Sequence, residues 1–102
     1  MTASRFRLSG LAFRDVERLY EDGLTKFGLA IVDHYYDGLF AAFDFLADYP
    51  RAARLRMEID PPARVYRYRS HVIVYELDDN DVVLILRIRH GREDWQADGS
   101  SH

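Results

Sequence analysis

The sequence predicts an α+β domain in which a helical hairpin covers one face of a small antiparallel sheet. Alternating apolar residues near the N-terminus indicate a short strand, and two long segments then show helical periodicity. The last third contains runs of β-branched and aromatic residues separated by an acidic turn. Strands joined by short turns pair antiparallel, so these runs should form a three-stranded meander in a two-layer domain.

A strand followed by a helix is expected at the N-terminus. Phe6 and Leu8 alternate with arginines, which predicts a strand over residues 5–8 with both apolar side chains inward. Ser9 is a candidate helix N-cap because its hydroxyl can accept a hydrogen bond from the first turn, although no Glu or Gln completes a capping box. From Leu11 the apolar residues recur at helical spacing.

Two glycines bear on where this first helix ends. Gly23 costs roughly 1 kcal/mol relative to alanine inside a helix. Either the helix stops near Asp22, or Gly23 allows a second helix to approach closely. Gly28 suits the left-handed position after a helix C-terminus. A second helix is expected from about residue 29 to 48, because Pro50 disfavours helical geometry in the residue before it.

The second predicted helix has a broad apolar face. The residues that recur on it at three- and four-residue steps are Val32, Tyr35, Tyr36, Leu39, Phe43 and Leu46. Phe40 and Phe45 lie off this stripe and are expected to be exposed. Such residues can be ordinary surface, but an apolar patch on a helical hairpin is also what a partner helix would need.

The C-terminal third predicts the meander. After a loop over residues 51–63, the expected strands are residues 64–69, 72–77 and 82–88, joined by a break at 70–71 and an acidic turn at 78–81. The third strand begins with an uncharged run that suits a central strand covered on both faces. Arg87 interrupts this run, so its charge should emerge at the sheet edge or pair with an acidic group.

The composition is that of one folded domain. At 102 residues the chain can bury one core, and an apolar fraction of 48% with 14% aromatic residues can offset the chain entropy lost on folding. We expect a single domain over residues 1–95 and a polar, disordered tail over residues 96–102.

The residue types exclude several classes of site. The chain has no cysteine, which excludes disulfides and thiolate metal sites and fits a reducing cytoplasm. Its four histidines lack paired ligand spacing, so we expect neither a metal nor another cofactor. No apolar run approaches the length of a membrane span, and the N-terminus lacks an apolar signal core. These features predict a cytoplasmic protein without membrane contact.

The net charge of −3 conceals an asymmetry. Residues 10–50 contain three cationic residues against eight acidic ones, a balance of −5, whereas residues 51–92 contain nine arginines against six acidic residues, a balance of +3. An arginine-rich half beside an acidic half predicts two partners on two faces, one of them anionic. The alternative is that codon usage places arginine where other proteins have lysine.

The C-terminal strands also carry a recognisable pattern. It reads Tyr-Arg-Tyr-Arg-Ser-His-x-Ile-x-Tyr from Tyr66, then the acidic turn, then Ile-Leu-Arg-Ile-x-His-x-Arg-x-x-Trp ending at Trp95. This pattern resembles the C-terminal half of the ParE toxins, which belong to the RelE/ParE superfamily of bacterial toxin–antitoxin modules. The resemblance extends over about residues 4 to 95 and implies the same two-layer fold.

Three functions are compatible with the sequence. The resemblance implies a toxin that inhibits DNA gyrase by binding, without bond-breaking chemistry, and that is neutralised by a ParD-like antitoxin with a ribbon-helix-helix domain. A RelE-type ribosome-dependent mRNA endoribonuclease shares the fold and is the first alternative. The third interpretation is a non-toxic binding module whose basic face holds nucleic acid or protein.

Each function assigns residues. Target binding falls on the cationic and aromatic residues of the last strands, namely Arg67, Arg69, His71, Arg87, Arg89, His90, Arg92 and Trp95. The resemblance implies that the antitoxin crosses the helical hairpin, where Tyr36, Phe40 and Phe45 are candidate anchors.

Catalysis has a weaker basis in the sequence. In a ribonuclease, His90 would serve as the base with Arg87 and Glu76 assisting. That set departs from the RelE pattern of clustered lysines and arginines with a C-terminal tyrosine. This chain has Lys26 as its one lysine and no tyrosine after Tyr75.

Overall fold

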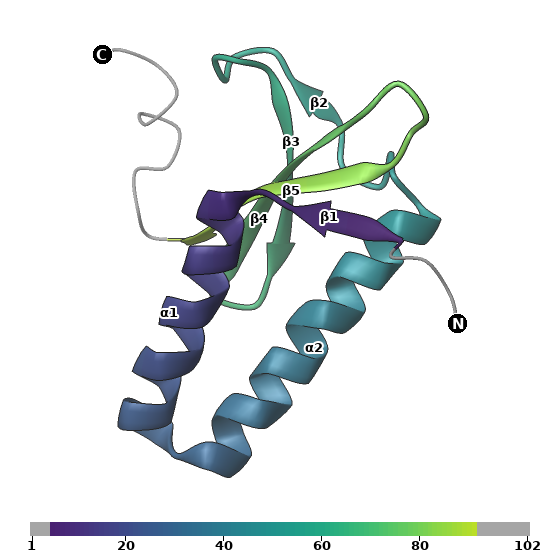
Figure 1. Ribbon diagram of the computed structural model, residues 1–102. Coiled ribbons are helices and arrows are strands. Elements are labelled where there is room, and N and C mark those ends of the chain that lie inside the picture. The colour runs from purple at the N-terminus through teal and green to yellow at the C-terminus, as the bar shows by residue number, and fades with distance from the viewer. Residues whose placement is uncertain (1–4, 92–102) are drawn as a thin grey trace.

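The computed structural model describes residues 5–91 and confirms the α+β class (Figure 1). Its elements in chain order are β1 (Phe6–Leu8), α1 (Gly10–Phe27), α2 (Leu29–Asp48), β2 (Leu55–Arg56), β3 (Ala63–Tyr68), β4 (His71–Leu77) and β5 (Val83–His90). The described residues contain no helix long and apolar enough to cross a membrane. They also contain no group of three or more histidine or carboxylate side chains that could hold a metal ion.

The sheet has the strand order β1-β5-β4-β3-β2. The predicted meander is confirmed, because β3, β4 and β5 pair antiparallel with their neighbours in sequence. β1 pairs parallel with β5, so the first strand lies beside the last one and β5 is central. The acidic turn forms as expected: the Asp78 carboxylate accepts from the backbone N–H groups of Val82 and Asn80, at 2.9 and 2.8 Å, and these bonds lower its pKa.

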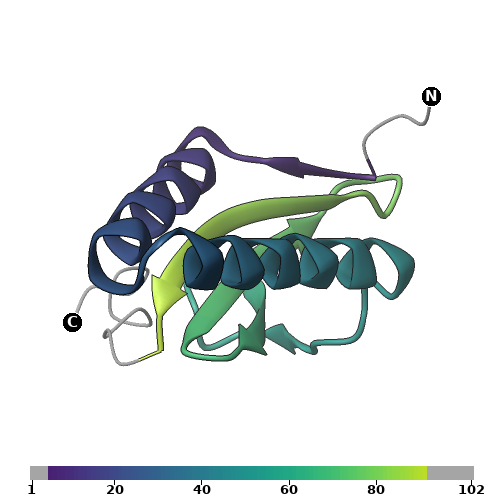
Figure 2. The same cartoon turned by 90° about the horizontal axis from the view of Figure 1, so that it is seen from below.

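Both helices cover one face of the sheet (Figure 2). The largest fully buried side chains lie between the two layers and include Phe43, Leu39, Tyr75 and Ile85. Within residues 5–91, the other face has a small cluster of Ile59, Val65 and Val72 with Val74 packed on it. The expectation that the third strand is covered on both faces is therefore wrong: Leu84, which alternates with buried neighbours, is half-buried on the uncovered side.

The helix signals have the expected structural roles. The Ser9 hydroxyl accepts from the backbone N–H of Ala12 at 3.0 Å, so Ser9 is the N-cap of α1. Gly28 has φ of 88° and separates the two helices. At Gly23 the second alternative is correct, because α1 continues to Phe27 and a Cβ at Gly23 would lie 2.7 Å from Val32 Cγ2 on α2.

The predicted loop over residues 51–63 contains an element that the sequence did not indicate. β2 adds a fifth strand, in which Leu55 and Arg56 pair antiparallel with Arg64 and Ala63. Two residues are too few to show a period of two, so only the neighbouring strand edge defines β2. This strand lies at the opposite end of β3 from the turn that leads to β4.

Candidate functional site

Several described cationic residues of the last three strands meet at one end of the sheet. In register, Tyr68 on β3 lies opposite His71 on β4, which in turn lies opposite His90 on β5. The Gly91 N–H donates to the Ser70 carbonyl at 2.7 Å and joins the end of β5 to the β3–β4 turn. We call this region the cationic corner; it comprises Arg67, Arg69, Ser70, His71, Arg89, His90 and Gly91.

The structure brings five of the eight expected target-binding residues into this corner, namely Arg67, Arg69, His71, Arg89 and His90. Arg92 and Trp95 lie outside the described residues. Arg87 is directed elsewhere. Its guanidinium binds the Asp15 carboxylate of α1, with Nε 2.8 Å from Oδ2 and Nη2 3.2 Å from Oδ1. The pairing expected for a charge in this strand is therefore present.

Arg87 lies at an irregularity in the sheet. Tyr75 is opposite Ile85 but Val74 is opposite Arg87, so Leu86 is an extra residue in β5 and forms a β-bulge. After Ile85, the edge of β5 that pairs with β1 has no further strand of the described chain beside it, and side chains of α1 and its N-cap bond to it instead. The Ser9 hydroxyl donates to the Leu86 carbonyl at 2.8 Å. The Ile88 N–H donates to Asp15 Oδ2 at 2.9 Å. The bulge and this edge pairing fix the direction of the last residues of β5.

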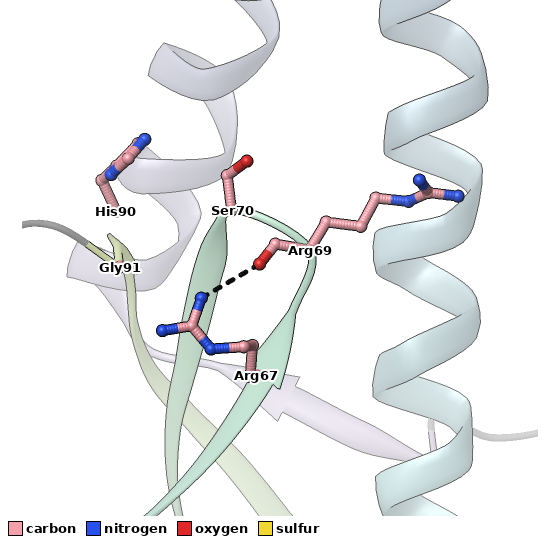
Figure 3. A pocket seen from close by; sticks show the side chains of 5 residues that line it. All are labelled: Arg67, Arg69, Ser70, His90 and Gly91. Carbon is pink, nitrogen blue, oxygen red and sulfur yellow. Dashed lines mark hydrogen bonds between the residues drawn. The ribbon is translucent and has the colours of Figure 1, made fainter.

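Arg67 and Arg69 extend to opposite sides of the β3–β4 turn (Figure 3). Arg67 donates from Nη1 to the Arg69 carbonyl at 3.2 Å, whereas Arg69 donates from Nε to the Tyr68 hydroxyl at 3.3 Å and lies over the Tyr68 ring. Tyr66 and Tyr68 pack on the main core, so the expected alternation holds and Arg67 is exposed on the face without helices.

Neither Arg67 nor Arg69 pairs with a carboxylate within residues 5–91. Other arginines in the same range do so, namely Arg5, Arg7, Arg51, Arg54, Arg56 and Arg87. The partners of Arg67 and Arg69 are a carbonyl and a hydroxyl, which orient a guanidinium without cancelling its charge. The corner therefore presents positive charge that is held in place.

The backbone of the turn is unusual at Arg69. Its φ is 51°, in the left-handed region that favours glycine or asparagine over a long side chain. Tyr68 holds the turn against α2, because its hydroxyl donates to the Tyr35 carbonyl at 3.2 Å and lies directly over Gly38. A Cβ at Gly38 would overlap that hydroxyl. The turn is thus fastened to the helix while it carries an arginine in a conformation that costs energy.

Aromatic and imidazole rings line the helix side of the corner. The Tyr35 hydroxyl and His71 Nδ1 are 2.6 Å apart and hydrogen-bonded, and the ring of His71 packs edge-on against that of His90 at 5.3 Å. Burial raises the pKa of Tyr35. Tyr35 therefore remains a neutral hydroxyl at ordinary pH, and it ties α2 to the first residue of β4.

Two cavities meet at the corner. One has a volume of about 480 Å³ and is lined by Arg67, Arg69, Ser70, His90 and Gly91, with no carboxylate among them (Figure 3). The other, of about 610 Å³, is a groove between the helical hairpin and the ends of β4 and β5. Phe27, Ile31 and Tyr35 contribute apolar surface to this groove. Ser70 and His90 line both cavities, so a molecule in the groove would cover part of the corner.

The aromatic residues expected to be exposed on α2 differ from one another. The expectation that Phe40 is exposed is wrong, because Phe40 is half-buried. Its ring lies 4.9 Å from that of Phe43 and 6.2 Å from that of Phe6 on β1. Tyr36 is half-buried and packs on Phe40 at 4.8 Å. Phe45 is 40% exposed, as expected, and stacks near Tyr66.

The larger apolar surface lies where the two helices meet. Phe27 is 62% exposed and Leu29 and Ile31 are each 58% exposed, with Leu24 beside them in sequence at 42%. Periodicity alone would not have indicated this surface, because Phe27 is four residues after Gly23 and so continues the stripe of α1 that contains Ala12 and Val16. Asp15, Tyr35 and Gly38 were also missed as residues that shape the corner, because their partners lie far away in the sequence.

The residues suggested for catalysis do not form one group. Glu76 is opposite Leu84, whereas His90 is opposite His71. Glu76 therefore lies five positions along β4 from His71, roughly 16 Å along an extended strand. Arg87 is bonded to Asp15. His90 thus lacks both of the assisting side chains that the sequence suggested.

A helical hairpin on one face of a five-stranded sheet, with an arginine-rich end to the last strands, is the layout that the resemblance to the RelE/ParE superfamily implies. Residues 6–95 match the family model described as the ParE toxin of the type II toxin–antitoxin system, parDE. The chain therefore belongs to the ParE toxin family. The family also implies an antitoxin as partner.

Individual relatives agree. Toxin ParE3 of Caulobacter vibrioides is 30% identical over 78 residues, which cover 76% of this chain and 77% of that protein. Toxin ParE1 of Mycobacterium tuberculosis is 28% identical over 92 residues, or 90% of this chain and 94% of that protein. A solved structure described as the chromosomal ParDE TA system from P. aeruginosa covers 85% of this chain and 98% of that one. The TM-score is 0.67 and the sequence identity is 16%, so this comparison shows that the two chains share a fold.

Proposed function

We propose that this ParE toxin inhibits DNA gyrase by binding it through the cationic corner. The observation that carries the proposal is the pair Arg67 and Arg69, whose guanidinium groups are fixed by a carbonyl and a hydroxyl and have no carboxylate partner in the described chain. The protein has a net charge of −3, yet these two positive charges remain uncompensated by carboxylates of the described chain at one end of the sheet. Such a local positive charge favours an anionic partner. We place this activity in the cytoplasm, on a single domain over residues 1–95.

Binding accounts for the corner better than bond cleavage does. A ribonuclease needs a base and an acid in reach of the same phosphate, with cations around it. His90 has arginines near it, but Glu76 lies at the other end of β4 and Arg87 is engaged by Asp15. An inhibitory binder needs only charge and shape, and these features are present at the corner.

The direct test is inhibition of purified gyrase. Wild-type toxin is expected to reduce supercoiling and to increase gyrase-cleaved DNA, whereas Arg67→Gln with Arg69→Gln should lose both effects while retaining its fold. Arg54→Gln is the matched control, because Arg54 is 72% exposed and lies toward the opposite end of β3. Unimpaired gyrase at saturating toxin would contradict the proposal. Cleavage of ribosome-bound mRNA would instead assign the RelE-type activity.

We further propose that a ParD-like antitoxin with a ribbon-helix-helix domain neutralises the toxin by occupying the groove beside the hairpin. The groove combines apolar Phe27 and Ile31 with charged Arg18, Asp22 and Lys26, a lining that fits an amphipathic segment. A segment in this groove would reach Ser70 and His90, which also line the corner, and would therefore obstruct target binding.

The antitoxin proposal is tested by exchanging the apolar anchor. Phe27→Glu is expected to weaken antitoxin binding at least tenfold in calorimetry without loss of helical signal, because Phe27 is 62% exposed. Phe45→Glu, on the far part of α2, tests the anchor suggested by the sequence. If Phe45→Glu alone weakens binding, the antitoxin crosses the other end of the hairpin.

A further inference from the structure

The cavity of the cationic corner has the lining of an anion site. About 480 Å³ of open space is lined by Arg67, Arg69, Ser70, His90 and Gly91, none of which is acidic (Figure 3). We propose that this cavity binds a phosphate group of a nucleic-acid backbone. Resting on the proposed gyrase inhibition, the inference means that the toxin grips the DNA that gyrase holds, in addition to the enzyme.

The Arg67 side chain is preorganised for such a ligand by a hydrogen bond within the protein. One N–H of Nη1 donates to the Arg69 carbonyl, which leaves Nη2 and Nε as donors. Gly91 provides the space for this arrangement, because a Cβ there would lie 2.9 Å from Arg67 Nη1 and 3.2 Å from the Ser70 carbonyl. A fixed guanidinium loses less side-chain entropy when it binds, so its donors gain more from each contact.

The kinds of donor favour phosphate over a protein carboxylate. A carboxylate offers two oxygens in one plane, which a single guanidinium fork can satisfy. A backbone phosphate presents oxygens in several directions, and arginine, serine and similar donors together make most contacts to it. The cavity is lined from β3, the β3–β4 turn and β5, and it offers a guanidinium from Arg67 and a hydroxyl from Ser70.

The surroundings limit the orientation of a bound nucleic acid. Arg67 lies on the sheet face without helices, and in register it flanks Val72 together with Arg89. The eight acidic residues between positions 10 and 50 all lie in the two helices, which cover the opposite face. DNA should therefore approach the sheet side of the corner.

The test uses the full chain labelled with ¹⁵N and titrated with a short DNA duplex or with an oligoglutamate peptide of equal charge. The duplex is expected to shift the Gly91 amide and Arg67 Nε–H signals with a dissociation constant on the order of 100 µM at low salt. The peptide should leave them unchanged. Equal shifts from both probes, or no shift with DNA, would overturn the phosphate site.

Salt dependence supplies the second readout. If Arg67 contacts one phosphate, Arg67→Gln should reduce the slope of log affinity against log salt by about one, and Arg54→Gln should not change it. An unchanged slope for Arg67→Gln would also overturn the site. Both measurements omit gyrase, so they separate the two proposals: DNA binding without gyrase inhibition removes only the proposed target, and inhibition without DNA binding removes only the phosphate site.

Discussion

The Asp15 carboxylate on α1 holds Arg87 on β5 through two hydrogen bonds, 2.8 and 3.2 Å long, between residues 72 positions apart. The same carboxylate accepts the N–H of Ile88 at 2.9 Å, immediately after the β-bulge. One acidic side chain thus neutralises the charge that interrupts the third strand and also pairs with the free edge of that strand. The direction of the residues that lead into the cationic corner depends on it.

Removing this carboxylate should destabilise the fold. Asp15→Ala leaves the Arg87 charge and the Ile88 N–H without their partner, and we expect a loss of about 2 to 3 kcal/mol in the free energy of unfolding. Urea denaturation measures it. The control is the cycle with Arg87→Ala, whose coupling energy should be at least about 1 kcal/mol. Additive effects would show that the pair contributes little.

A methyl group at Gly38 should disturb the fastening of the β3–β4 turn. Gly38→Ala places a Cβ against the Tyr68 hydroxyl, and we expect a loss of about 1 to 3 kcal/mol in unfolding free energy from overpacking. Gly10→Ala is the control, because nothing lies within 4 Å of its added Cβ. Tyr68→Phe should recover part of the loss in the double variant. Equal stability of the two alanine variants would contradict the close contact.

Arg69 should separate stability from function. Arg69→Gly relieves a left-handed residue with φ of 51°, so we expect the free energy of unfolding to stay equal or to rise by up to about 1 kcal/mol. The same change removes a corner charge, so inhibition of gyrase should fall. Arg69→Ala retains the strain and loses the charge, and it should be the less stable of the two variants. Full inhibition by Arg69→Gly would exclude the guanidinium from target binding.

Stability should decline in alkaline solution. Burial raises the pKa of both Tyr35 and Tyr75 above the model-peptide value of 10.0. Above about pH 10 the unfolded chain loses these protons first, so the stability they contribute is complete below that pH and is lost as the pH rises through the folded-state values. Denaturant unfolding from pH 8 to 11 measures this slope. The double variant Tyr35→Phe, Tyr75→Phe should show a shallower slope, and Tyr49→Phe, at a residue 61% exposed, is the control.

Phe40 and Phe27 should respond oppositely to truncation. Phe40 packs on Phe6 and Phe43, so Phe40→Ala is expected to cost about 3 kcal/mol in unfolding free energy. Phe27→Ala should change it by less than about 0.5 kcal/mol, because its ring is 62% exposed. Thermal or urea unfolding of the two variants decides this. A stable Phe40→Ala variant would return that ring to the list of surface anchors.

The sequence predicted those elements whose signals are local. Ser9 and Gly28 are residue types that commonly cap helices, and they stand at the two ends of α1. In the acidic turn at 78–81, the Asp78 carboxylate accepts hydrogen bonds from nearby backbone N–H groups. The alternation of Tyr66 and Tyr68 with arginines correctly separated the core face from the exposed face. Each of these features is determined by interactions among a few neighbouring residues.

What the sequence could not give is decided by distant partners. The parallel pairing of β1 with β5 places Phe6 beside Phe40, so a ring that lies off the apolar stripe of α2 becomes half-buried. The same holds for Arg87 with Asp15 and for Tyr35 with His71. The position of Arg87 in an apolar run indicated that its charge needs an acidic partner or an exit at the sheet edge, but it did not indicate that Asp15 is that partner.

The pairing of the first strand with the last one also affects how the protein is made. β1 finds its place in the sheet only beside β5, and the corner closes only when Gly91 bonds to Ser70. A nascent chain on the ribosome therefore has no completed cationic corner until residue 91 has emerged. Interrupted translation, or proteolysis that removes β5, leaves β1 without the strand that it pairs with and leaves the corner open.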